Sequence, residues 1–592
     1  MRKLILIAVL CISQLVSSQN DIIADDYFKR GEFEKALISY QRLYDEKPGG
    51  TKYLYKIIST LQQLERFDEA EQLMLQKLTK SNSPMLIVEL GYNYQLKDSL
   101  DLAKTKYDEA MTYLDERPYY VYSLARKFEE HSLLDYAIKV YEKGMVLQPE
   151  KNYNIQLARI YADQGDVPKM FTNYIDYLED KPTFISNAKR AISGFISENS
   201  SNENNATLRK LLLKKLQASP EAHWYELLSW LYVQEKAYNK SFTQEKALYR
   251  RNPESLDRII DLGIAALDDK QYDVTKDVFN YILETSQDVP TLLLAHQYLL
   301  DIDTELGTQE EYPQINDKYL ELFNIYGKFE PTLPLQISYG NFLAFYVNKP
   351  KEGSNFLKQS LKLTLSPFQE ASVKLKIADI LVFQEKFNEA LIYYSQIQAN
   401  LKNSTIAQEA RFKVAKTSYY KGDFEWAESQ LKILKSSTSQ LIANDALDLK
   451  LLISDNKYED STQTALKIYA KADLMAYQNN TSKAIELLEK ILVEHKGESI
   501  IDQALFKQAQ LYEKKKQYRK AEVNYQKIIA DYREDILADD AYFHLAELYN
   551  YHLAEPEKAK PLYEKVLFEH EDSIYFIEAR KKFRMLRGDA IN

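Results

Sequence analysis

Residues 24–48 decide the fold, and they read ADDYFKRGEFEKALISYQRLYDEKP. Ala24 and Tyr27 share one face of a predicted helix, which ends in a turn at Gly31. The second predicted helix carries its small and aromatic residues on one face: Phe33, Ala36 and Tyr40. Pro48 ends this helix because proline cannot continue it. Small residues let two helices cross closely while rings fill the space beside them, so the stretch predicts a helical hairpin.

The alanine of this hairpin recurs along the chain at a nearly constant interval. In the N-terminal third the intervals are 34, 33 and 34 residues: Ala36, Ala70, Ala103 and Ala137. Later it recurs in pairs 37 residues apart: Ala390 and Ala427, then Ala484 and Ala521. Such a period is typical of stacked helical hairpins. With only 15 glycines and 16 prolines in 592 residues, the composition also favours helices, and we predict an all-α fold.

This pattern resembles the tetratricopeptide repeat (TPR), in which a small residue, an aromatic residue, an alanine, a second aromatic residue and a proline follow at fixed positions. The resemblance covers most of the first ~180 residues and about the last 230. It implies an α-solenoid, a right-handed superhelix of TPR-type hairpins. The longer C-terminal repeats are similar to those of β-barrel assembly lipoproteins and of the Tol–Pal accessory protein, which implies a role in the bacterial envelope.

The repeat pattern divides the chain into regions. Four regions are predicted: a signal peptide at 1–18, an N-terminal TPR array at 19–197, a degenerate helical-repeat region at 198–334, and a C-terminal TPR array at 335–592. The polar stretch ENSSNENN at 198–205 is expected to be a loop, and two prolines between Gly327 and Pro334 mark the next boundary.

The loops between the C-terminal hairpins carry acidic and hydroxyl residues, as in 535–541 and 572–579. We expect these side chains to cap the amides at the next helix start and to complement its dipole. A final helix around residues 573–586 is predicted to cap the array, because the last repeat of a solenoid has no following neighbour.

The N-terminus has the features of a secretory signal. Arg2 and Lys3 precede the apolar run 4–12, and small residues follow up to Ser18, where we predict cleavage. The run is far shorter than the ~20 residues of a membrane-spanning helix, so no transmembrane segment is expected in the mature chain. Cys11, the single cysteine, lies inside the run, which does not fit a lipid-accepting site. We expect export to the periplasm, with an outer-membrane-associated or extracellular location as alternatives.

Motifs for catalysis or cofactor binding are missing from the sequence. None of the seven histidines forms a His-Glu-x-x-His pair, and neither Gly-x-Ser-x-Gly nor Gly-x-Gly-x-x-Gly occurs. Asp540, His544 and Glu547 have helical spacing, which we interpret as a surface ion pair rather than a metal site. We therefore expect no enzyme, no cofactor and no metal.

The function predicted from this pattern is a non-catalytic protein–protein interaction scaffold of the bacterial envelope. A formal net charge of −10 argues against nucleic acid as a partner, so we expect protein partners and association with an envelope complex. A SusD-like surface glycan-binding protein is the alternative, although such proteins are lipoproteins. An enzyme similar to the soluble lytic transglycosylases would need a separate catalytic domain, for which the repeats leave no room.

The TPR resemblance implies that a partner peptide or helix binds the concave groove, lined by the first helix of each hairpin. Applied to the C-terminal array, it predicts a strip of twelve groove residues: Phe412, Lys416, Tyr419, Tyr420, Tyr469, Asp473, Tyr477, Phe506, Gln510, Phe543, Glu547 and Tyr551. Because aromatic residues dominate the strip, we expect recognition to be mainly apolar and only mildly salt-dependent. The alternative is that these rings fill the inside curve of a tightly wound superhelix.

Overall fold

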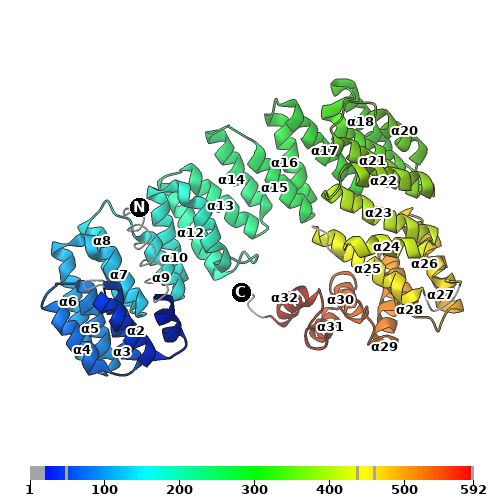
Figure 1. Ribbon diagram of the computed structural model, residues 1–592. Coiled ribbons are helices and arrows are strands. Elements are labelled where there is room, and N and C mark those ends of the chain that lie inside the picture. The colour runs from blue at the N-terminus through cyan, green and yellow to red at the C-terminus, as the bar shows by residue number, and fades with distance from the viewer. Residues whose placement is uncertain (1–20, 47–50, 435–438, 458–461, 589–592) are drawn as a thin grey trace, which may run out of the picture. The chain divides into compact units, whose positions relative to one another are not determined.

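The computed structural model describes residues 21–46, 51–434, 439–457 and 462–588. Within these ranges the chain forms helices joined by turns and short loops, without any β-strand (Figure 1). The predicted all-α fold is confirmed: the chain is an α-solenoid of helical hairpins. The predicted signal peptide and Pro48 lie outside the described residues.

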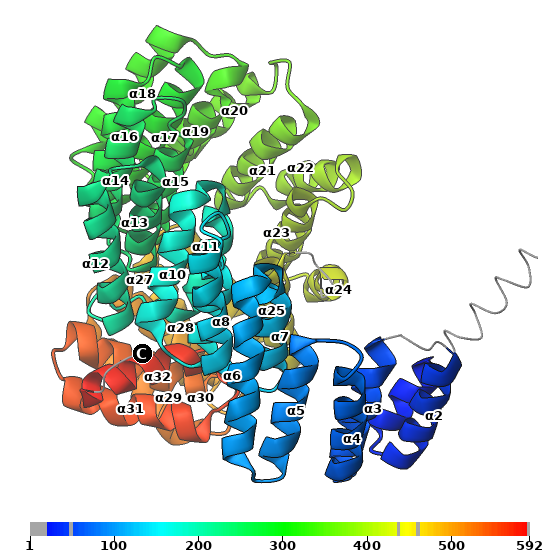
Figure 2. The ribbon, with the colours of Figure 1, turned by 90° about the vertical axis from the view of Figure 1, so that its left-hand side faces the viewer.

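Backbone contacts divide the chain into two units, which are described separately here. The first unit holds residues 1–196 and 203–227. Its helices are a helix over 21–29, α2 (Phe33–Glu46), α3 (Thr51–Gln63), α4 (Phe67–Leu78), α5 (Pro84–Leu96), α6 (Leu100–Glu116), α7 (Val121–Glu130), α8 (Leu134–Leu147), α9 (Asn154–Asp163), α10 (Val167–Asp180), α11 (Ile185–Ile192) and α12 (Glu203–Ala218). Neighbouring helices pack as hairpins, as Figure 2 shows for α2 to α8.

The second unit holds residues 197–202 and 228–592, and α13 (Ala222–Gln234) crosses the division. Its first helices are α14 (Tyr238–Arg251), α15 (Asp257–Asp268), α16 (Tyr272–Thr285), α17 (Val289–Leu306), α18 (Tyr312–Tyr326), α19 (Leu333–Phe345), α20 (Pro350–Ser360), α21 (Pro367–Phe383), α22 (Phe387–Asn400), α23 (Thr405–Lys421) and α24 (Phe424–Leu434). The remaining helices are α25 (Gln440–Asn456), α26 (Thr464–Tyr477), α27 (Thr481–Glu494), α28 (Ile501–Lys514), α29 (Tyr518–Asp531), α30 (Ala538–Glu547), α31 (Pro556–Glu569) and α32 (Phe576–Arg587).

The period found in the sequence reappears in the backbone of the hairpin turns. In five hairpins of the first unit one residue in the turn has a positive φ: Gly31, Glu65, Asp98, Ser132 and Gly165. In the second unit the same turn residue has this conformation in many hairpins: Lys236, Lys270, Asn348, Glu385, Gly422, Asn479, Lys516 and Ala554. Residues other than glycine rarely adopt a positive φ. The recurrence of this conformation in the turns therefore indicates that helix packing imposes one turn geometry.

The recurring alanines lie at the helix crossings, as predicted. Ala36, Ala137, Ala390 and Ala521 have no solvent-exposed surface. In the second unit, one continuous hydrophobic core extends from α19 to α32. The predicted C-terminal cap is present as α32, which ends where Gly588 adopts φ 83°. Packing between neighbouring hairpins therefore supplies the core.

The structure contains one helix that the repeat pattern did not predict. Helix α25 follows the α23–α24 hairpin and packs on both of its helices, with Ala446, Leu449 and Ile453 buried. The next hairpin nevertheless continues the array, because α26 packs directly against α23. Helix α25 is thus an insertion beside the regular stack of first helices.

Two local expectations need correction. The predicted polar loop at 198–205 is shorter, because α12 begins at Glu203 and buries Asn205. The loops of the C-terminal array cap the following helices only in part: Ser573 Oγ accepts a hydrogen bond from the Tyr575 amide, and Asp502 accepts one from the Gln503 amide. The N-cap residues of α28, α30 and α32 are Ile500, Leu537 and Tyr575, and none of them makes a side-chain cap hydrogen bond. Asp502 lies in the first turn of α28, and Asp539 and Asp540 lie in that of α30, where acidic side chains complement the helix dipole as expected.

Candidate functional site

The structure places the predicted groove residues on consecutive first helices of the C-terminal hairpins. Helices α23, α26, α28 and α30 carry eleven of them, and Tyr551 lies in the π-helical segment Leu548–His552 that follows α30. The repeat pattern therefore assigned the helices correctly. Exposure differs widely among the twelve side chains, and they do not form one open strip.

Four of the twelve residues are buried, which corrects the prediction that they present themselves to a partner. They are Tyr419, Tyr469, Asp473 and Phe543. Tyr419 is completely enclosed, and its ring packs against those of Tyr420 and Phe424. These four side chains agree with the alternative given above, in which groove residues fill the inside curve of the superhelix.

Asp473 is buried together with two cations. Its carboxylate lies 2.6 Å from the Lys416 ammonium and 2.9 Å from that of Lys507, so α26 is tied to α23 and α28. Burial alone would raise the pKa of Asp473, but the two ammonium groups outweigh it and hold the pKa well below its usual range. Lys416 and Asp473 thus serve the packing of first helices.

Tyr420 and Tyr477 face aromatic rings of their own chain. The Tyr477 ring centroid lies 6.1 Å from that of Tyr420 and 5.7 Å from that of Phe345 on α19. Its hydroxyl donates a hydrogen bond of 3.2 Å to the backbone carbonyl of Asp379. Burial raises the pKa of both tyrosines. These two side chains are half-buried, and neither projects freely into solvent.

The last part of the predicted strip is more open. Gln510 is exposed, and Tyr551 is 59% exposed with the Lys582 ammonium 4.7 Å from its ring centroid. The same ammonium lies 2.5 Å from Glu547, which also accepts a hydrogen bond from Tyr563. Lys582 lies on α32, so its ion pair with Glu547 helps to attach the capping helix to α30.

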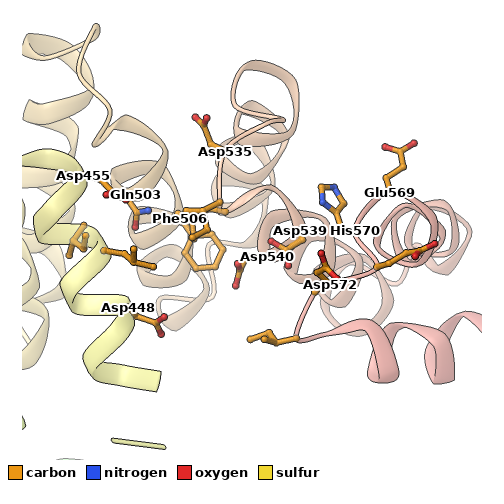
Figure 3. Close-up of a pocket in the computed structure, with 17 residues that line it drawn as sticks. Asp448, Asp455, Gln503, Phe506, Asp535, Asp539, Asp540, Glu569, His570 and Asp572 are labelled. Carbon is orange, nitrogen blue, oxygen red and sulfur yellow. The ribbon is translucent and has the colours of Figure 1, made fainter. Parts of the chain in front are cut away.

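A cavity of about 660 Å³ opens beside Phe506, the half-buried aromatic residue of α28. Figure 3 shows α25 on one side of it and the segments preceding α30 and α32 on the other. Eight carboxylates line it: Asp448, Asp455, Asp535, Asp539, Asp540, Glu569, Glu571 and Asp572. Its other lining groups include His570, Gln503 and the isoleucines Ile536 and Ile574, which are 61% and 86% exposed. The repeat pattern does not predict this cavity, because the inserted helix α25 forms one of its walls.

The cavity carries an excess of negative charge. No lysine or arginine is among its lining residues, although Glu569 at its edge pairs with Arg533 and Lys565. Burial raises the pKa of Asp540 to about 6, and the carboxylates of Asp539 and Asp448 add to this effect. Burial likewise raises the pKa of Asp502, near the cavity on α28, to about 6, with Asp535 and Asp455 contributing. The raised pKa values come mainly from burial, and repulsion by neighbouring carboxylates contributes to them.

His544 does not form the predicted ion pair. Its ring lies among the aromatic rings of Phe506, Tyr525, Phe543 and Tyr575. Burial lowers its pKa, which favours the neutral imidazole. Within the described residues, no group of histidine, cysteine and carboxylate side chains has the arrangement of a metal site. None of the helices in the described ranges combines the length and apolarity needed to span a bilayer.

Comparisons with known proteins agree with the helical-hairpin architecture. Residues 503–535, which comprise most of α28, all of α29 and the segment after it, match the family "Tetratricopeptide repeat". No curated protein matches this chain in sequence.

Two solved structures show similarity over nearly the whole chain. One is the structure of Naa15/Naa10 bound to HypK-THB, with 13% identity, a TM-score of 0.30, and coverage of 97% of this chain and 94% of that one. The other is the APC/C hetero-tetramer Cut9–Hcn1, with 13% identity, a TM-score of 0.26, and coverage of 97% and 98%. At these scores neither comparison carries an argument about function. The helical hairpins make this chain an α-solenoid, in which residues 503–535 match the tetratricopeptide repeat.

Proposed function

We propose that this protein is a non-catalytic protein–protein interaction scaffold of the bacterial envelope, and that it binds a partner at the cavity beside Phe506. The acidic cavity is the observation that carries the proposal. The cavity is lined by eight carboxylates and has two exposed isoleucines at its rim. It lies in a fold built from TPR-type hairpins. A surface that combines one sign of charge with exposed apolar groups suits a partner segment of matching composition.

The chemistry of the cavity specifies this partner segment. Lysine or arginine side chains would neutralise the excess negative charge of the cavity, and apolar side chains would cover Ile536 and Ile574. The partner is therefore a basic amphipathic segment. This differs from the mainly apolar recognition expected for the groove strip, because the strip is largely occupied by the chain's own packing. Binding at the cavity should weaken clearly as salt is raised.

The location in the envelope rests on the predicted signal peptide at residues 1–18. It is tested by expressing the full chain with a C-terminal tag, fractionating the cells and sequencing the N-terminus of the purified protein. We expect a periplasmic or outer-membrane fraction beginning at Gln19. A cytoplasmic protein that retains Met1 would contradict the envelope role.

The binding proposal is tested with a displayed library of random peptides selected on the purified protein. We expect selected peptides to be enriched in lysine or arginine together with leucine or isoleucine. Their affinity, measured by fluorescence anisotropy, should fall at high salt. It should also fall at least about tenfold in the Asp448→Lys, Asp535→Lys double variant, which places repulsive charges on opposite walls of the cavity.

A matched control has the same change in net charge away from the cavity. Glu486 and Glu494 are exposed carboxylates of α27, and the Glu486→Lys, Glu494→Lys variant should bind the peptides as the unmodified protein does. An equal loss of peptide affinity in both variants would mean that the net charge of the protein, and not the cavity, determines binding. Peptides lacking basic residues, or peptides that bind the cavity variant unchanged, would remove the cavity as the partner site.

A further inference from the structure

The last turn of α26 contacts helices that are not its neighbours in the array. In a solenoid each repeat packs only against the repeats before and after it. Between α21 and α26 lies the intervening first helix α23, yet α26 reaches both α21 and α19. The contacts span 86 to 134 residues of sequence. They therefore close one turn of the C-terminal array upon itself.

Polar groups at the hairpin turns make this contact. Its bonds are Tyr477 hydroxyl to the Asp379 carbonyl at 3.2 Å, Gln478 Nε2 to the Phe383 carbonyl at 2.8 Å, Asn479 Nδ2 to the Phe345 carbonyl at 3.4 Å, and Lys471 Nζ to the Glu385 carboxylate at 2.8 Å. Glu385 and Asn479 are the positive-φ residues in the turns of their hairpins. The contact thus joins the turn between α21 and α22 to the turn between α26 and α27.

An aromatic cluster lies behind these polar groups. Phe345, Phe383, Tyr420 and Tyr477 come from four helices, and the ring centroids of Phe345 and Phe383 are 5.0 Å apart. All four side chains are half-buried. The repeat cores, in contrast, consist of fully buried residues such as Ala415 on α23 and Leu474 on α26. The aromatic cluster therefore lies at the partly exposed edge of the core, against which Phe345, Tyr420 and Tyr477 pack.

Because the polar bonds and the aromatic rings lie at the edge of the core, the contact can open without unfolding a repeat. The Lys471 and Glu385 side chains are each 42% exposed, so water can replace their ion pair readily. The carbonyl oxygens at the ends of α19 and α21 can likewise exchange their amide donors for water. Packing of α21 on α22, of α22 on α23 and of α23 on α26 does not depend on these groups.

We propose that the last turn of α26 and the ends of α19 and α21 form a latch that closes the concave face of the C-terminal array over the aromatic cluster. The latch occupies Tyr420 and Tyr477 with the chain's own groups. A ligand that reaches these two positions has to open it. The latch is a property of the free protein and does not depend on the cavity beside Phe506 or on its partner.

The test measures the distance across the latch in the full chain. Cys11→Ser removes the single natural cysteine, and Glu389→Cys on α22 with Lys490→Cys on α27 places spin labels at two exposed positions. Lys471→Glu and Glu385→Lys each turn the ion pair into a repulsion. We expect either change to lengthen and broaden the distance distribution measured by double electron–electron resonance. The double reversal should restore the parent distribution.

Two further variants complete the test. Gln478→Ala removes a donated hydrogen bond without a charge change, and it should lengthen the distance in a protein with unchanged circular dichroism. Lys483→Glu breaks an ion pair with Glu486 inside α27 and should leave the distance unchanged. An unaltered distance in Lys471→Glu and Gln478→Ala would overturn the latch. The same result follows if the double reversal fails to restore the parent distance.

Discussion

Gly91 on α5 lies against the ring of Tyr107 on α6, so closely that a Cβ at Gly91 would be 2.6 Å from Tyr107 Cε1. The ring is itself buried, and a Cβ would also approach the Ala103 carbonyl oxygen to 3.2 Å. Glycine is thus needed at this crossing for space, although it lowers helix propensity. The first unit depends on this contact in the same way that other repeats depend on their alanines.

Replacing Gly91 by alanine should destabilise the protein. Alanine gains about 0.5–1 kcal/mol in helix propensity, but overpacking against a fixed ring costs typically about 1–3 kcal/mol. We expect a lower midpoint of urea denaturation followed by circular dichroism. Gly497→Ala is the matched control, because a Cβ there meets no atom within 4 Å and the midpoint should not fall. A stabilised Gly91→Ala variant would show that the ring can move aside.

Ala521→Leu tests the recurring alanine itself. Ala521 on α29 is fully buried beside Tyr525, so a larger side chain should overpack the crossing and cost about 1–3 kcal/mol. Val523 lies two residues further on the same helix and is 60% exposed. Val523→Leu should therefore change stability by less than about 0.5 kcal/mol. Equal thermal midpoints for the two variants would contradict the close crossing at Ala521.

The framework residues predicted the hairpins because their spacing reports a local requirement. A small residue at each helix crossing, such as Ala36 or Ala521, is needed whatever the rest of the array does. The turn geometry follows from the same packing, and non-glycine residues such as Glu65 and Lys516 accept a positive φ there. One sequence was therefore enough to predict that most of these helices exist, in which order they follow and which of them pair.

Helix α25 and the exposure of the groove were not predictable in the same way. Ala427 and Ala484 are 57 residues apart, which leaves room for an extra helix within a period of 37. This long interval was the available signal, although it does not say where the helix packs. Burial of Tyr419 and the contacts of Tyr477 depend on how tightly the array curves. Curvature arises from packing between hairpins and has no simple periodic pattern in sequence.

Asp473→Asn should destabilise the protein at neutral pH. It leaves Lys416 and Lys507 without their shared counter-charge, at a cost of about 1–3 kcal/mol because the lysines can partly rehydrate. The folded-state pKa of Asp473 is depressed, so its stabilisation is present above the unfolded value near 4 and is lost as pH falls below it. Urea denaturation at pH 7 and pH 3.5 should show the difference from the parent shrinking at the lower pH. A pH-independent difference would mean that packing dominates.

Asp540→Asn should act in the opposite direction. The pKa of Asp540 is raised to about 6 in the folded protein, against about 3.9 when unfolded, so folding favours its protonated form. Its contribution to stability is fully present below pH ~4 and is lost as pH rises through ~6. Above that pH the folded protein carries a partly buried carboxylate opposite Asp448 and Asp539.

Asparagine removes this carboxylate and keeps a side chain that can accept the hydrogen bond from Tyr575. We expect the Asp540→Asn variant to be more stable than the parent by about 1–2 kcal/mol at pH 7.5 and nearly equal to it at pH 4. Glu564→Gln, at an exposed position of α31, controls for the change in net charge and should have little effect at either pH. Urea denaturation curves of the parent and of both variants, recorded at pH 7.5 and pH 4, measure these differences in stability. An Asp540→Asn variant that is less stable than the parent at pH 7.5 would mean that the Asp540 carboxylate is stabilised within the cavity. The effect of burial and of repulsion by Asp448 and Asp539 would then be wrong.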